Sequence, residues 1–185
     1  ADAFGVFVEV RETEIDEIAI ARFRKEAQAL ADVRSPHCVQ ILGFSTWWGG
    51  FYLAMEYVEG KNLHEYLQAG PMKPFETILV IAGVARGLFS AHQNGLIHRD
   101  VKPANILLPA GQPASADNRI KVTDFGVAKS IQMERPDGTP VTQLSGTDQF
   151  VGTMAYASPE QLMGDELDAK TDIYSLGLVA YECIT

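Results

Sequence analysis

Residues 98–105 of the chain are His98-Arg99-Asp100-Val101-Lys102-Pro103-Ala104-Asn105, and a shorter run, Asp124-Phe125-Gly126, follows them. Together the runs supply the groups of a phosphoryl-transfer site. Asp100 can orient a hydroxyl nucleophile, and Lys102 can meet the charge on the transferred group. Asn105 and Asp124 can hold magnesium against phosphate oxygens. The shorter run also occurs in ordinary turns, so the longer run carries most of the information.

A third motif lies downstream, at residues 152–160: Gly152-Thr153-Met154-Ala155-Tyr156-Ala157-Ser158-Pro159-Glu160. With these three motifs in this order, the chain resembles the catalytic domain of eukaryotic-type Ser/Thr protein kinases, in a bacterial-like form. The resemblance implies an α+β, two-lobed protein-kinase-like fold. Residues 1–57 are expected to form a small antiparallel β lobe with one helix, and residues 58–185 a mainly helical lobe. Both lobes are expected to be incomplete, because the glycine-rich loop and the later helices of the family have no counterpart in this sequence.

The resemblance also implies ATP and Mg²⁺ as cofactors and places the adenine pocket. Met55 is expected at the back of this pocket, and a core methionine that fills space is the alternative interpretation. The backbone of Glu56 and Val58 is expected to bond adenine, and Leu107 to pack beneath the ring.

Further residues are expected to support or regulate the site. Asp172 is expected to brace the catalytic loop from below, although by position alone it is also a plausible helix N-cap. Arg99 is expected to pair with a phosphorylated residue of an activation loop at residues 127–157. Thr147, followed by Ser145, is the favoured phosphoacceptor. The remaining matched positions are Thr153 in the floor of the substrate site, together with Glu26, His98, Phe125, Gly126 and Glu160.

The first strand departs from the family pattern. Alignment on the helix that carries Glu26 puts Glu9 where the family has its phosphate-binding lysine. A carboxylate there repels phosphate and Glu26, by about 1 kcal/mol at contact in water and by more when desolvated. Phe7 stands where a small alanine is common above adenine, and Arg11 replaces the lysine only with a slipped register. These departures support the alternative of a pseudokinase or relic that acts as a protein-binding module.

The favoured hypothesis is transfer of the γ-phosphoryl group of Mg-ATP to a Ser or Thr hydroxyl of a protein, by positioning and charge neutralisation. Lys102 and the pair Gly152-Thr153 favour Ser/Thr over Tyr as the acceptor. A kinase-like small-molecule phosphotransferase is the third hypothesis. The motif at residues 152–160, which shapes the peptide site in protein kinases, disfavours it.

Composition limits the other functions. The 185 residues are 46% apolar, as expected of a chain that buries a core, and their net charge of −9 argues against nucleic-acid binding. Cys38 and Cys183 lack metal-ligand spacing and predict reduced, buried thiols in a cytoplasmic protein. No apolar run of membrane-spanning length and no signal peptide are expected, so a membrane tether of the parent protein would lie outside these residues.

Periodicity and turn residues predict the elements around the motifs. The last helix is expected to be apolar nearly all round and buried, and truncation within it to leave apolar surface that favours self-association. The expected elements are a strand at 4–10, a helix at 15–33, strands at 39–44 and 51–56, a short helix capped by Asn62, a long helix from Phe75 to a stop at Asn94-Gly95, strands at 106–108 and 120–122, and a helix at 172–185.

Overall fold

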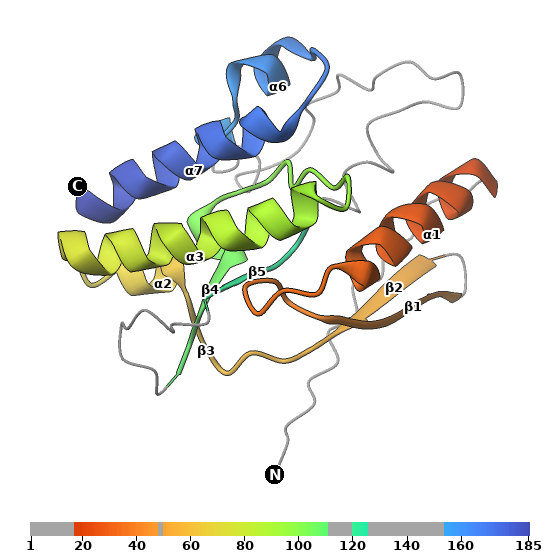
Figure 1. The fold of residues 1–185 in the computed structure, drawn as a ribbon, viewed down its shortest axis with the longest axis horizontal. Helices are drawn as coiled ribbons and strands as arrows, with labels where there is room; N and C mark the ends of the chain where they lie inside the picture. Colours follow the sequence, from red (N-terminus) through yellow and green to blue (C-terminus); the bar gives the residue numbers. More distant parts are fainter. Residues whose placement is uncertain (1–16, 48–49, 111–119, 126–153) are drawn as a thin grey trace.

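The computed structural model describes residues 17–47, 50–110, 120–125 and 154–185 (Figure 1). Its order of elements confirms the expected α+β fold and each helix and strand predicted within these ranges. The strand expected at residues 4–10 lies outside the described residues. The elements are α1 (Glu17–Asp32), β1 (Ile41–Trp47), β2 (Gly50–Met55), β3 (Gly60–Asn62), α2 (Leu63–Leu67), α3 (Pro74–His92), the 3₁₀ helix η1 (Pro103–Asn105), β4 (Ile106–Pro109), β5 (Lys121–Val122), α6 (Pro159–Met163) and α7 (Ala169–Ile184).

The first sheet is the antiparallel pair β1 and β2. Its register runs from Ile41 opposite Met55 to Trp47 opposite Gly50. Helix α1 packs against β1, and Figure 1 shows it lying beside this hairpin. Beyond the strands the ladder continues by one bond, because the Glu56 amide donates to the Gln40 carbonyl at 2.9 Å.

The second sheet has the order β3-β4-β5, with both pairs antiparallel. A parallel bridge between Cys38 and Val122 joins it to the loop that precedes β1. In this bridge the Val39 amide donates to the Val122 carbonyl, and the Val122 amide donates to the His37 carbonyl, both at 2.9 Å. Strand β5 therefore joins the second sheet to the segment that leads into the first sheet.

Local capping explains where the helices begin and end. The Asn62 side chain accepts a bond from the Glu65 amide at 2.8 Å, and Glu65 accepts one from the Asn62 amide at 3.0 Å, which confirms the predicted cap of α2. Helix α3 begins at Pro74, whose missing N–H is harmless in a first turn. The expected stop follows α3, since Gly95 takes a φ of 72°, a conformation that glycine adopts without strain.

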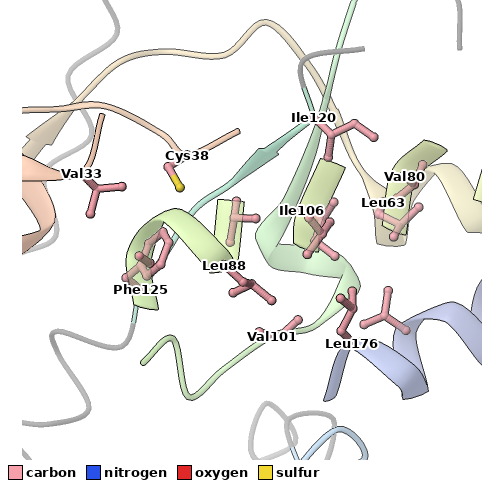
Figure 2. Close-up of a cluster of buried hydrophobic side chains, with 14 of the residues drawn as sticks. Val33, Cys38, Leu63, Val80, Leu88, Val101, Ile106, Ile120, Phe125 and Leu176 are labelled. Atoms are coloured by element: carbon pink, nitrogen blue, oxygen red, sulfur yellow. The ribbon is translucent and has the colours of Figure 1, made fainter. Parts of the chain in front are cut away.

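Side chains from both parts of the chain meet around α3 in the core. Figure 2 shows labelled members of this cluster from α2, α3, β4 and α7. Helix α3 lies alongside α7 and also packs on β5 (Figure 1). Each fully buried aliphatic side chain contributes roughly 1.5–3 kcal/mol, so α3 is a main source of stability. The large side chains that are fully buried include Leu63, Val84, Leu88, Val101, Ile106, Ile120, Val122 and Val179.

By length and composition alone, helix α3 is apolar enough to cross a membrane. One face of α3 supplies Val80, Val84 and Leu88 to the core. The core helix of a globular protein can have the same length and apolar composition as a membrane span. The length of α3 is thus weak evidence for a membrane span.

Helix α7 corrects the expectation that it is buried nearly all round. Leu176 and Val179 face the core, but Ile173 is 54% exposed and Tyr181 is 67% exposed. These side chains are exposed because, in the described part of the chain, α3 is the helix that packs most extensively against α7. Apolar composition predicted burial, but it did not show which faces have neighbours.

Gly87 allows the loop before β1 to approach α3. A Cβ atom at this position would lie 2.6 Å from the His37 carbonyl oxygen and 3.2 Å from Cγ2 of Val122. Backbone oxygen cannot swing aside as the end of a side chain can. Gly87→Ala is therefore expected to lower the free energy of unfolding by about 1–3 kcal/mol, despite the better helix propensity of alanine.

Gly177 provides the matched control in α7, because a Cβ atom there would meet no atom of the described residues within 4 Å. Gly177→Ala is expected to raise the free energy of unfolding by roughly 0.5–1 kcal/mol through helix propensity alone. Urea unfolding of the two variants measures both effects. Equal stabilisation by the two substitutions would contradict the close approach at Gly87.

Candidate active site

Asp172, fully buried in the first turn of α7, holds the backbone of the 98–105 run. Its Oδ2 accepts a hydrogen bond from the His98 amide at 2.8 Å, and its Oδ1 accepts one from the Arg99 amide at 2.9 Å. Nε2 of His92, in the last turn of α3, lies 2.7 Å from Oδ2 of Asp172. Two core helices thus converge on the start of the run.

The alternative interpretation of Asp172 as an N-cap is wrong. The N-cap of α7 is Asp168, whose Oδ1 accepts a bond from the Lys170 amide at 2.7 Å. This bond lowers the pKa of Asp168. Asp172 lies within the helix, and its carboxylate bonds across to another segment.

Arg99 has a φ of 64°, a left-handed conformation that is uncommon for residues other than glycine. Such strain costs of order 1–3 kcal/mol and persists only when the surroundings hold it. Asp172 holds the Arg99 amide, and Nε2 of Gln161 donates to the Arg99 carbonyl at 2.8 Å. Gln161 is not predicted from the sequence as a site residue, although its spacing from Ser158 is that of a capping box, which the structure contains.

The His98 ring joins the two catalytic runs. Its Nε2 donates to the Thr123 carbonyl at 2.9 Å, and its Nδ1 accepts from the Asp100 amide at 3.2 Å. The ring also packs on Phe125, with centroids 4.6 Å apart. These two bonds require the neutral imidazole with its proton on Nε2. Burial lowers the pKa of His98 below its ordinary value, against the opposing effect of the Asp172 charge.

This lowered pKa predicts a loss of stability in mild acid. As the pH falls below about 6.5, the unfolded chain takes up a proton on this imidazole and the folded chain does not. Stability present above that pH is therefore lost as the pH falls toward the folded-state pKa, by at most about 1.4 kcal/mol per pH unit. Replacing His98 with glutamine, which keeps an N–H donor, is expected to reduce this pH dependence.

Urea unfolding of both proteins at about pH 7.5 and about pH 5.5 checks this prediction, because the difference between the two proteins cancels the titration of other groups. The native chain should lose more stability between the two pH values than His98→Gln does. Identical losses of stability in the two proteins would contradict a lowered pKa of His98.

Asp100, Lys102 and Asn105 form one cluster. Nζ of Lys102 lies 3.0 Å from Oδ2 of Asp100. Nδ2 of Asn105 donates to the Asp100 carbonyl at 2.9 Å and to Oδ2 of Asp100 at 3.2 Å. Because the amide nitrogen of Asn105 bonds Asp100, its oxygen is the atom suited to a cation.

Asp124 follows a residue that is bonded to this cluster. The Thr123 amide donates to the Asn105 carbonyl at 3.0 Å, and Asp124 itself is exposed with a φ of 56°. Among the described residues no group of three or more His, Cys, Asp or Glu is placed to hold a metal. An amide oxygen and one carboxylate fit Mg²⁺, which keeps several waters and is usually shared with substrate phosphates. The donor set fits an ion that binds together with a nucleotide.

The expected adenine side lies next to this cluster. Met55, at the end of β2, accepts a contact on Sδ from Oγ1 of Thr123 at 3.8 Å. It also packs partly on the core, as the space-filling interpretation expects. Leu107 is half-buried on β4, opposite Lys121 of β5. Glu56 follows Met55 directly and contacts Lys121, so the structure brings the start of the segment at residues 56–58 to the strand that leads to Asp124.

The other predicted site residues lie farther from the cluster or outside the described residues. Glu26 is half-buried on α1. Glu160 on α6 accepts a hydrogen bond from the Thr171 hydroxyl at 2.7 Å, and this bond lowers the pKa of Glu160. Thr171, the neighbour of Asp172, is not predicted from the sequence as a site residue. The predicted residues outside the described ranges are Phe7, Glu9, Arg11, Gly126, Ser145, Thr147 and Thr153.

The chain is similar to known proteins in sequence and in fold. The family model of the protein kinase domain matches residues 6–185. The chain is 44% identical over 169 residues to the serine/threonine-protein kinase PknB of Mycobacterium leprae, an alignment that covers 89% of this chain and 25% of that protein. It is 36% identical over 173 residues to the probable serine/threonine-protein kinase PknB of Lactococcus lactis, covering 93% and 25% respectively.

The solved kinase domain of Mycobacterium tuberculosis PknI is also similar, with a TM-score of 0.70 and 27% identity. That match covers 96% of this chain and 62% of the solved one. The chain spans about a quarter of the length of the curated relatives named above. The chain belongs to the protein kinase domain family, and the two curated relatives described above are bacterial proteins named as a serine/threonine-protein kinase and a probable one.

Proposed function

We propose that this chain is the catalytic segment of a protein serine/threonine kinase and transfers the γ-phosphoryl group of Mg-ATP to a Ser or Thr hydroxyl of a protein substrate. The observation that carries this proposal is the contact of Asp100 with both Lys102 and Asn105. Asp124 follows Thr123, which is bonded to Asn105. The names of the relatives support the same activity.

Each residue of the cluster has a chemical role in this proposal. The Asp100 carboxylate orients the substrate hydroxyl and accepts its proton. The Lys102 ammonium group neutralises charge on the transferred group. Asn105 and Asp124 would hold Mg²⁺, which supplies charge neutralisation at the phosphates when it is bound.

The adenine end of the nucleotide is assigned to the segment after β2, next to the cluster. Adenine would bond the backbone of Glu56 and Val58, with Met55 behind it and Leu107 beneath it. The division into lobes at residues 57 and 58 belongs to this proposal, because the nucleotide would then bind where the lobes join.

Regulation through Arg99 is also proposed. Nε of Arg99 is buried and has no hydrogen-bond partner among the described residues. A buried guanidinium nitrogen without a partner is costly, and a phosphate on Thr147 or Ser145 would supply the missing acceptor. Phosphopeptide mapping of the active protein checks this assignment, because label on neither residue would contradict it.

The proposed partner is a protein with a Ser or Thr acceptor in the cytoplasm, bound over the segment with Thr153 in its floor. Nucleic acid is not a proposed partner, given the net charge of −9. Self-association is proposed as a secondary property, through the exposed apolar side chains Ile173 and Tyr181 of α7. A pseudokinase is not favoured, since the motif residues are present and the relatives are named as kinases.

A transfer assay tests the function. The chain would be incubated with Mg²⁺, γ-labelled ATP and a mixed protein substrate, and the labelled protein hydrolysed to its amino acids. We expect label on serine and threonine. Label on tyrosine would contradict the assigned acceptor, and no transfer above a control without the chain would contradict the activity.

A further inference from the structure

Residues 121–123, which are β5 and the residue after it, alternate between two neighbours. Lys121 and Thr123 contact the end of β2, through Glu56 and Met55 respectively. Val122 faces the other way, where its Cγ2 lies close to Gly87 of α3. Side chains on alternate sides are the ordinary pattern of a strand. The pattern places the Lys121 side chain against Glu56, the residue that follows Met55.

The pair of Lys121 and Glu56 is short and partly withdrawn from water. Nζ of Lys121 lies 2.6 Å from Oε1 of Glu56, and the two side chains are 16% and 30% exposed. The same Glu56 oxygen accepts a bond from the Gln40 amide at 2.7 Å, and Nζ also donates to the Cys38 carbonyl at 3.3 Å. Charge-assisted bonds of this kind are stronger than neutral ones, and partial burial reduces screening by salt.

An exposed pair on α7 provides the comparison. Nζ of Lys170 lies 3.2 Å from Oδ2 of Asp168, and their side chains are 89% and 60% exposed. Pairs so exposed contribute little, because solvent screens the charges and holding two long side chains costs entropy. The Lys121 pair is therefore the one expected to fix the position of a backbone segment.

We propose that Lys121 is a positioning residue for nucleotide binding, because it holds Glu56 and thereby sets the 56–58 backbone relative to Asp124. The inference rests on the proposed function. Lys121 precedes Asp124 by a few positions along one strand and the turn after it. One short segment thus fixes the proposed adenine contact and the proposed magnesium ligand together, so that their separation matches a single bound nucleotide.

Amide hydrogen exchange of the 185-residue chain without nucleotide tests the positioning directly. In Lys121→Met, the Glu56 amide, which bonds Gln40, is expected to exchange about tenfold faster, while amides of α7 keep their native rates. Lys170→Met, which removes the exposed pair, is the matched control and should leave Glu56 unchanged. Unchanged exchange at Glu56 in Lys121→Met would overturn the proposal, as would equal acceleration throughout α7.

Nucleotide affinity provides the second readout. Lys121→Met is expected to weaken ATP binding about tenfold both with and without Mg²⁺, so the enhancement by Mg²⁺ keeps its native value. A general distortion of β5 would instead displace Asp124 and lower that enhancement, and this result would overturn the positioning role.

The double variant Lys121→Met with Glu56→Gln distinguishes an effect of the ion pair on ATP affinity from separate effects of its two side chains. If the two side chains act as one unit, the double variant binds ATP as weakly as the single variants, whereas fully additive losses would contradict the pairing. Failure of the native chain to bind Mg-ATP would count against the proposed function. The exchange of the Glu56 amide would still decide whether Lys121 holds the 56–58 backbone in place.

Discussion

Replacing Asp100 with asparagine is expected to lower the rate of phosphoryl transfer by about 10²- to 10⁴-fold, the usual effect of losing a general base. The substitution removes the group that orients and deprotonates the hydroxyl. It preserves the shape of a side chain that contacts Lys102 and Asn105. Because Asp100 is assigned to the acceptor and not to the nucleotide, the affinity for ATP is expected to change by about twofold or less.

Single-turnover transfer from labelled ATP measures this effect without interference from product release. Lys170→Met is the control, since this exposed side chain is bonded to Asp168 at the start of α7. A rate for Asp100→Asn equal to that of the control would show that Asp100 is not the base.

Replacing Asp172 with alanine is expected to lower the free energy of unfolding by about 3–5 kcal/mol, the range for losing one partner of a buried charged network. The amides of His98 and Arg99 would lose their acceptor, and His92 would lose its contact. Unsatisfied buried donors keep their full desolvation penalty. The left-handed conformation of Arg99 would also lose one of its two restraints.

Asp168→Ala is the matched control for Asp172→Ala, because it removes a carboxylate from the same helix. Loss of that N-cap is expected to cost only about 1 kcal/mol. Urea unfolding measures both variants. If Asp172→Ala destabilises the chain no more than Asp168→Ala does, the buried network does not hold the catalytic run as described.

Much of the fold follows from local sequence. The caps at Asn62 and Gly95 were predicted because capping depends on neighbouring residues and backbone conformation. The contact of Asp100 with Asn105 also spans only a few residues, so a motif can specify it. The family resemblance then implied the arrangement of the two lobes, which periodicity alone does not give.

Contacts between distant segments were not predictable in the same way. Nothing near Lys121 in the sequence indicates that it bonds Glu56, or that His92 lies against Asp172. These pairs depend on how strands and helices pack, and a charge pattern along the chain does not record that packing. The exposed face of α7 has the same origin, because apolar composition does not show which neighbour covers a helix.

Calorimetric titration of the folded chain with ATP, with and without Mg²⁺, tests the central claim most directly. The assignment of Asn105 and Asp124 as magnesium ligands predicts that Mg²⁺ strengthens ATP binding and that Asp124→Ala abolishes this enhancement. Absence of ATP binding, or an enhancement by Mg²⁺ that persists in Asp124→Ala, would contradict it.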